Sequence, residues 1–316
     1  MIEVRGLTKR YGDVLAVDDL SFDVPAGAVT GFLGPNGAGK STTMRAIVGL
    51  DRPSAGTVEV NGHAYTDDRA PLVEVGALLE AKAIHPGRSA FNHLLFLAQS
   101  NGIGRRRVRQ VLELVGLEGV ARKRAGTFSL GMGQRLGIAA ALLGDPSTLL
   151  FDEPVNGLDP EGIIWVRTLL KGFAAEGRAV LVSSHLMAEM ALTADRLVVI
   201  GRGRLLADTT VADFIASAAT AQVTVRSSDQ SRLADALRGA GGQVEPDAQQ
   251  SDRLVVVGLT SDVIGQIAFD AAVVVHELTP QQPSLEEAFM SMTADSVQFH
   301  ASTPGAETTP QEMAHV

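Results

Sequence analysis

The sequence has no cysteine among its 316 residues, which excludes disulfides and thiol chemistry and permits a reducing compartment. It has no excess of positive charge either: the formal net charge is −9 and the pI is near 5.3, whereas non-specific nucleic-acid binding calls for a basic domain. The first residues, "MIEVRGLTKRYG", lack the apolar core of a signal peptide. No apolar run reaches the roughly eighteen residues of a transmembrane helix. We therefore expect a globular chain that does not cross a membrane by itself.

The order of apolar runs predicts two domains and a tail. Residues 1–215 alternate short apolar runs such as "AVTGFL", "TLLF" and "AVLVSS" with segments of helical period, which is typical of an α/β domain with a mostly parallel sheet. Its opening predicts an added antiparallel β subdomain, and residues 87–145 predict a helical subdomain. Residues 220–293 predict a small β-α-β-α-β accessory domain of α+β type. Residues 294–316 are rich in Thr, Pro, Ala and Gln and predict a disordered tail.

The stretch "GPNGAGKST" fits the phosphate-loop pattern G-x-x-x-x-G-K-[ST] between an expected strand and an expected helix. Glycines let backbone N–H groups surround a phosphate chain, the lysine reaches the terminal phosphates and the serine hydroxyl ligates Mg²⁺. A glycine-rich turn matching by chance is the other interpretation, at roughly one in fifty. We expect ATP and Mg²⁺ to bind here, at Gly34, Pro35, Asn36, Gly37, Ala38, Gly39, Lys40, Ser41 and Thr42.

Two adjacent acids end the apolar run "STLLFDEP". Asp152 is suited to a direct or water-mediated contact with Mg²⁺, and Glu153 to activating the attacking water. Taken alone, adjacent acids at a strand end are equally well explained as solvated loop residues. Together with the phosphate loop they predict a nucleotide-hydrolysing site.

Between these motifs, "FSLGMGQRLGIAAALL" predicts a helix that Ser129 caps, and a helix N-terminus attracts phosphate. The order of segments resembles the ATP-binding-cassette (ABC) ATPases, whose LSGGQ signature precedes the acidic strand. The resemblance implies a P-loop NTPase core and a signature that contacts the nucleotide of the opposite subunit. Leu130 and Met132 depart from the signature, so Ser129 and Gly131 are the contacts that carry over.

Further landmarks of the family occur in the expected order. By this resemblance Tyr11 in "KRYGD" stacks on adenine, Asp159 in "NGLDP" lines the dimer interface, and His185 in "VLVSSHL" contacts the terminal phosphate. A single tyrosine or histidine is more often structural, so these roles rest on position in the motif order.

Glu80 stands where the family usually has a glutamine that touches Mg²⁺ and water and couples to the membrane partner. A carboxylate also binds Mg²⁺, but it adds negative charge near the phosphates. Glu80 together with "SLGM" resembles the cassette subunits of bacterial antibiotic-export and bacteriocin-immunity transporters. The stretch "PSLEEAFMSMT" resembles the C-terminal end of drug-exporter cassette subunits. The other interpretation is an amphipathic helix that packs on the accessory domain.

Two segments of the helical subdomain are open to two interpretations. The apolar stretch "FNHLLFLAQSNGI" is either a groove for a permease helix or ordinary core. The basic stretch "GRRRVRQ" either faces anionic lipid or is a solvated helix face.

The predicted function is that of an ATP-hydrolysing subunit that dimerises head to tail on ATP, as a homodimer, and drives a separate export permease. This implies a cytoplasmic location on the inner face of the membrane. A soluble ABC ATPase acting on ribosomes or DNA is the alternative, but the chain has one phosphate loop, no sustained heptads and an acidic charge. A regulator without turnover is disfavoured because Glu153 is present. No nucleic-acid partner is expected.

Overall fold

A computed structural model describes residues 1–67, 69–80, 84–217, 222–247, 250, 252–281 and 283–293. The predicted tail, 294–316, lies outside the described residues. Of these residues, no helix is both long and apolar enough to cross a membrane.

The larger part of the molecule is built on a six-stranded sheet of order β5-β6-β7-β3-β8-β9. The first five strands pair in parallel and β9 is antiparallel to β8. Along the chain these strands are β3 (Ala28–Leu33), β5 (Val75–Leu78), β6 (Thr148–Asp152), β7 (Ala179–Ser183), β8 (Arg196–Gly201) and β9 (Arg204–Thr210). The register pairs Asp152 with Ser183 and Phe32 with Ser183. The carboxyl ends of β3, β6 and β7 therefore meet at one edge.

Both faces of this sheet are covered. Successive side chains of a strand point to opposite faces, so the apolar runs supply buried side chains to both. In β6, Leu149 and Phe151 belong to one buried cluster, which includes residues of α5, α6 and α7, while Leu150 belongs to another, which includes residues of α1 and of the strands near the N-terminus. The continuous apolar runs seen in the sequence are thus strands buried on both sides. The helices on these faces are α1 (Lys40–Ile47), α6 (Pro160–Ala175), α7 (Met187–Thr193) and α8 (Val211–Ser217).

A separate three-stranded antiparallel sheet of order β2-β1-β4 carries the predicted β subdomain. It consists of β1 (Ile2–Tyr11), β2 (Val14–Val24) and β4 (Ala55–Val60). The third strand, β4, follows α1 in the chain and pairs with β1. The helix α2 (Pro71–Glu74) leads from this region into β5.

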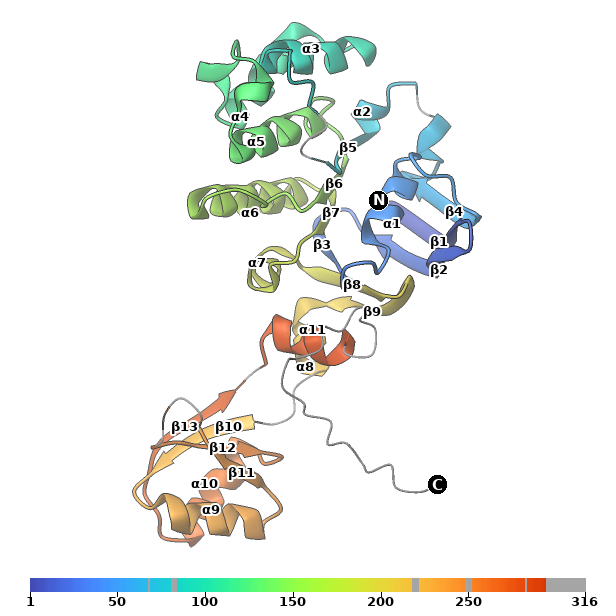
Figure 1. Ribbon diagram of the computed structural model, residues 1–316. Helices are drawn as coiled ribbons and strands as arrows, with labels where there is room; N and C mark the ends of the chain where they lie inside the picture. The colour runs from blue at the N-terminus through green and yellow to red at the C-terminus, as the bar shows by residue number, and fades with distance from the viewer. Residues whose placement is uncertain are drawn as a thin grey trace, which may run out of the picture.

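The predicted helical subdomain is present at one end of the molecule, where Figure 1 places α3, α4 and α5 beyond the sheet. These helices span Ala90–Ser100, Arg105–Leu114 and Leu130–Ala141. Val108, Val111 and Leu112 of α4 are buried together with Leu94 of α3 and Leu136 of α5. This apolar spacing of three and four residues is what made the helices recognisable.

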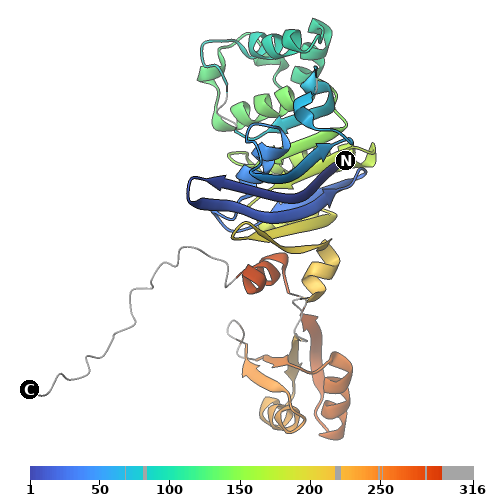
Figure 2. The same ribbon diagram turned by 90° about the vertical axis from the view of Figure 1, so that its right-hand side faces the viewer.

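The small domain lies at the opposite end (Figures 1 and 2) and has its own buried cluster. Its elements are β10 (Gln222–Ser227), α9 (Gln230–Gly239), β11 (Gln243–Pro246), β12 (Leu254–Val257), α10 (Ser261–Asp270) and β13 (Val275–Gln281). The antiparallel order β11-β12-β10-β13 is a ferredoxin-like β-α-β-β-α-β arrangement. The predicted β-α-β-α-β module therefore lacked one strand, the short polar β11.

The last described helix, α11 (Leu285–Thr293), does not join the small domain's core. Leu285, Ala288 and Phe289 are buried in the cluster of the larger domain, together with Phe214 of α8 and Met190 of α7. The sequence analysis included this helix in the expected accessory domain, residues 220–293, and gave packing on that domain as one of two interpretations. The structure instead returns the chain to the larger domain (Figure 2).

Candidate functional site

The turn between β3 and α1 carries the stretch that the sequence analysis predicted to be a phosphate loop. Gly39, which precedes α1, has a φ of 103°, and a Cβ there would lie 2.7 Å from the carbonyl oxygen of Ala16. A Cβ on Gly34 would lie 2.6 Å from the carbonyl oxygen of Ile200. Glycine is therefore required at both positions, by backbone conformation at the first and by space at both. The helix that follows presents its positive N-terminal end to the loop.

Lys40 is the cationic group of this loop. Its ammonium donates hydrogen bonds to the carbonyl oxygens of Gly34 and Pro35, the second at 3.2 Å. Burial lowers the pKa of Lys40, and the nearby carboxylates of Glu153 and Asp152 oppose that effect. The lysine is thus held inside the loop with two acids close enough to influence its charge.

Asp152, at the carboxyl end of β6, joins the loop to the neighbouring strand. Its Oδ2 accepts a hydrogen bond of 3.0 Å from the Ser41 hydroxyl, and its Oδ1 accepts one from the Ser183 hydroxyl. A hydroxyl and a carboxylate in contact are the oxygen donors that Mg²⁺ uses when phosphates and water complete its shell. The residues present therefore fit a Mg²⁺ ion.

Glu153 follows Asp152 directly, and its N–H, its carbonyl and its carboxylate each have a hydrogen-bond partner. Its backbone has a φ of 52°, which is rare for a non-glycine residue and is common at functional sites. Its N–H donates to Ser183 at both the carbonyl and the hydroxyl oxygen, at 3.2 and 3.1 Å, and its carbonyl accepts 3.0 Å from the Gln134 amide. Its carboxylate Oε2 lies 2.8 Å from His185 Nδ1. The Glu153 side chain is thereby aimed along the edge where the strands end.

Most of the loop, with Asp152 and Glu153, lines one cavity of about 330 Å³. Its walls combine the phosphate loop with the acidic strand end, at Ala16, Asn36, Gly37, Ala38, Gly39, Lys40, Ser41, Thr42, Asp152 and Glu153. Its size and its mixture of backbone donors, one cation and two acids suit the phosphates of a nucleotide.

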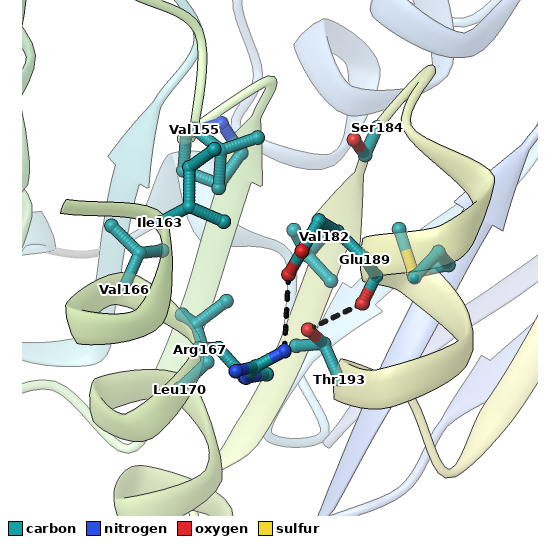
Figure 3. Close-up of a pocket in the computed structure, with 11 residues that line it drawn as sticks. Val155, Ile163, Val166, Arg167, Leu170, Val182, Ser184, Glu189 and Thr193 are labelled. Atoms are coloured by element: carbon teal, nitrogen blue, oxygen red, sulfur yellow. Dashed lines mark hydrogen bonds and ion pairs between the residues drawn. The ribbon is translucent and has the colours of Figure 1, made fainter. Parts of the chain in front are cut away.

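A second, much smaller cavity lies between α6, α7 and Val182 of β7 (Figure 3). Its volume of about 20 Å³ has room for a water molecule and not for a nucleotide. Arg167 of α6 pairs with Glu189 of α7 at 3.3 Å beside it. This pair joins α6 to α7, the helix that follows His185.

The predicted adenine-stacking residue, Tyr11, lies at the end of β1 and is about half exposed, at 45%. Its hydroxyl donates 2.8 Å to Asp51, and the Lys9 ammonium lies 4.9 Å from the ring centroid. Partial desolvation, followed by the Asp51 hydrogen bond, raises the pKa of Tyr11. The ring is therefore anchored at its hydroxyl and does not line the phosphate cavity.

The predicted dimer contacts lie away from the phosphate loop. Ser129 caps α5, accepting 3.2 Å from the Met132 N–H, and Asp159 caps α6, accepting 2.9 Å from the Gly162 N–H. The unexpected Leu130 lies against Gly157 of the "NGLDP" loop, so the starts of the two helices touch. Ser129, Gly131 and Asp159 thus share one surface region apart from the phosphate cavity.

Glu80 is exposed just after β5. It is not part of the lining of the phosphate cavity in the described chain. Its contact with Mg²⁺ stays a prediction.

Two residues that support the acids were not singled out from the sequence. Ser183 hydrogen-bonds both Asp152 and the backbone of Glu153, and buried Gln134 ties α5 to Glu153. Ser183 precedes the predicted His185 by two residues in "VSSHL", so its position at a strand end was the available signal. Gln134 had no signal of its own, because only the fold brings α5 to the acidic strand.

Comparison with known proteins identifies the family. The ABC transporter family matches residues 17–156, and a domain of unknown function, DUF8746, matches residues 221–286. The bacitracin transport ATP-binding protein BcrA of Bacillus licheniformis is 40% identical over 209 residues, which are 65% of this chain and 68% of that protein. The chain belongs to the ABC transporter ATP-binding proteins.

Other relatives cover more of this ABC ATPase. The uncharacterized ABC transporter ATP-binding protein YdbJ of Bacillus subtilis (strain 168) is 33% identical over 299 residues, 93% of this chain and 95% of its own length. A solved structure, the ATP binding subunit of an ABC transporter, is 29% identical with a TM-score of 0.63 and covers 69% of this chain and 92% of its own. The predicted family, fold class and ATPase activity are confirmed.

Proposed function

We propose that this ABC ATPase is the nucleotide-hydrolysing subunit of a bacterial exporter of antibiotic or peptide type, working as a head-to-tail pair on a separate membrane permease. The observation that carries the proposal is the single cavity in which the phosphate loop faces Asp152 and Glu153. The name of the 40% identical relative, a bacitracin transport ATP-binding protein, supports the class of cargo.

In this proposal ATP binds with its phosphates along residues 34–42. The backbone N–H groups of the loop and the start of α1 surround the phosphates, and Lys40 exchanges its carbonyl partners for phosphate oxygens. Ser41 and Asp152 would hold a Mg²⁺ ion, with Glu80 as a further proposed ligand. When bound, the ion neutralises charge on the phosphate oxygens.

Glu153 acts as the general base in the proposed reaction. Its carboxylate accepts a proton from water as the water oxygen attacks the terminal phosphorus, and the bond from that phosphorus to the bridging oxygen breaks so that ADP leaves. His185, 2.8 Å from Glu153 Oε2, orients that carboxylate and contacts the terminal phosphate. The hydrogen bonds from Glu153 N–H to Ser183, and from Gln134 to the Glu153 carbonyl, fix the base against rotation.

The site as proposed is completed by a second copy of the chain. Ser129, Gly131 and Asp159 do not line the phosphate cavity of their own subunit, and Ser129 is exposed at the N-terminus of α5. A head-to-tail pair brings these residues over the partner's phosphates, with Asp159 along the interface. Tyr11 then stacks on the adenine at the other end of the nucleotide.

The permease is proposed to be a separate chain, and the ATPase a cytoplasmic protein bound to it at the inner face of the membrane. The experiment is an affinity purification of tagged Glu153→Gln protein from gently solubilised native membranes with ATP and Mg²⁺. We expect a polytopic membrane protein to co-purify. The control carries Lys40→Ala in addition, which removes the nucleotide-dependent pairing. Recovery of ribosomal or DNA-bound proteins in place of a membrane protein would overturn the transporter assignment.

A further inference from the structure

The charges of this acidic chain are separated along its length. Residues 84–145, the helical subdomain, hold nine Arg or Lys and three Asp or Glu, a formal charge of +6. Residues 222–281, the small domain, hold four Arg or Lys and eight Asp or Glu, a formal charge of −4. Because these parts lie at opposite ends of the molecule (Figure 1), the protein has a basic end and an acidic end.

The basic end contains a hollow of about 650 Å³, which we call the arginine groove. Its charged lining consists of Arg105 and Arg109 from α4, Arg122 and Arg124 from the following connection, and one acid, Glu118. Backbone hydrogen bonds hold its base, from Phe91 N–H to the Ala121 carbonyl and from Ala90 N–H to the Lys123 carbonyl. The groove is therefore a built feature between two tied segments.

Within the described parts of the chain, no ion pair joins any of these four arginines to a carboxylate, and all four are exposed. Arg107, on the same helix, shows the contrast. Its guanidinium donates 2.8 Å to the Leu142 carbonyl and 3.0 Å to Asp145, so it serves the fold. Arg105 and Arg109 are left available for an external anion.

The placement of these charges opposes the stability of α4 itself. The helix begins after Gly104 without a side-chain cap, has no acid in its first turn, and opens with three arginines. Cations at this end are repelled by the positive end of the helix dipole, and an anion bound there reverses that repulsion. Solubility alone does not require three arginines at the N-terminal end of a helix.

We propose that the arginine groove binds the phosphate headgroups of anionic phospholipids, and so seats the basic end of the ATPase directly on the membrane surface. A planar anionic surface suits this molecule because it attracts the +6 end and repels the −4 end, which fixes one orientation. A soluble phosphate makes no use of that separation of charge. The proposal goes beyond permease binding, since it requires lipid alone.

The test is sedimentation of the full chain with vesicles that contain no protein. One set is made of phosphatidylcholine and the other of phosphatidylcholine with phosphatidylglycerol. We expect binding only to the second set, weakening as salt is raised. Each arginine near an anionic surface contributes about fivefold in affinity, so Arg105→Gln with Arg109→Gln lowers binding by about 30-fold.

The matched control is Arg202→Gln with Arg232→Gln, which removes two exposed charges outside the helical subdomain and is expected to bind as the unmodified chain does. Equal binding of the two double variants, or equal binding to both vesicle sets, overturns the proposal. Free glycerol phosphate that prevents sedimentation with the vesicles, at a concentration no higher than that of the accessible anionic lipid, also overturns the proposal, because it indicates a soluble ligand. ATP hydrolysis measured without vesicles is expected to be unchanged in both variants, so failure here is separable from failure of the proposed function.

Discussion

His185 Nδ1 lies 2.8 Å from Oε2 of Glu153, and the same oxygen accepts a hydrogen bond of 3.3 Å from the His185 backbone N–H. The two residues come from the ends of β6 and β7, which are neighbouring parallel strands. The loop after β7 therefore positions the carboxylate that the sequence predicted as the base. These two contacts allow His185 to orient the Glu153 carboxylate.

Replacing Glu153 by glutamine tests the assignment of the base. Glutamine keeps the size and the backbone contacts but cannot accept the proton, so turnover is expected to fall by roughly 100-fold or more. ATP affinity is expected to stay near that of the unmodified chain. Steady-state phosphate release and a nucleotide-binding titration measure the two quantities, and turnover close to the original rate would show that another group is the base.

Replacing Lys40 by alanine tests the phosphate loop. Each hydrogen bond from a charged group that is lost costs about 10- to 150-fold in affinity, so ATP binding is expected to weaken by about 100-fold. The control is Lys171→Ala on α6, which removes one exposed positive charge. Calorimetric titration with ATP and Mg²⁺ compares the two, and equal affinities would contradict a phosphate contact by Lys40.

The phosphate loop, the acidic pair and the helical subdomain could be predicted because each depends on local pattern. A glycine with a φ of 103° before α1, or apolar residues at helical spacing in α4, leaves a direct mark in the sequence. The contact of Gln134 with Glu153 could not be predicted, since it depends on how α5 crosses the acidic strand. The strand β11 was missed because three of its four residues are exposed and its sequence, "QVEP", has no apolar alternation.

Acid is expected to destabilise the protein through His93. This residue of α3 is only 7% exposed, and its Nδ1 has no hydrogen-bond partner among the described residues. Burial, with smaller contributions from Arg88 and His85, lowers the pKa of His93 from 6.5. The unfolded chain therefore binds a proton in the interval below 6.5 in which the folded chain does not, so stability falls as pH falls through that interval.

The variant His93→Leu is expected to reduce this loss. Urea midpoints at about pH 7.5 and about pH 5.5 measure it, with His276→Leu as the control because His276 is exposed on β13. A loss of stability between the two pH values as large in His93→Leu as in the unmodified chain would assign the acid sensitivity to other groups.

The packing of α11 against the larger domain predicts that this helix stabilises the ATPase domain. Phe289 is 7% exposed in the cluster that also holds Met190 of α7, whereas its neighbour Met290 is 62% exposed. Phe289→Ala is expected to cost about 3–5 kcal/mol and Met290→Ala close to nothing. The only tryptophan, Trp165, lies in α6 of the larger domain, so its fluorescence reports on that domain alone. If urea unfolding followed at Trp165 has the same midpoint in both variants, α11 does not support the ATPase domain. A lower midpoint for Phe289→Ala alone shows that the buried face of α11 stabilises the larger domain.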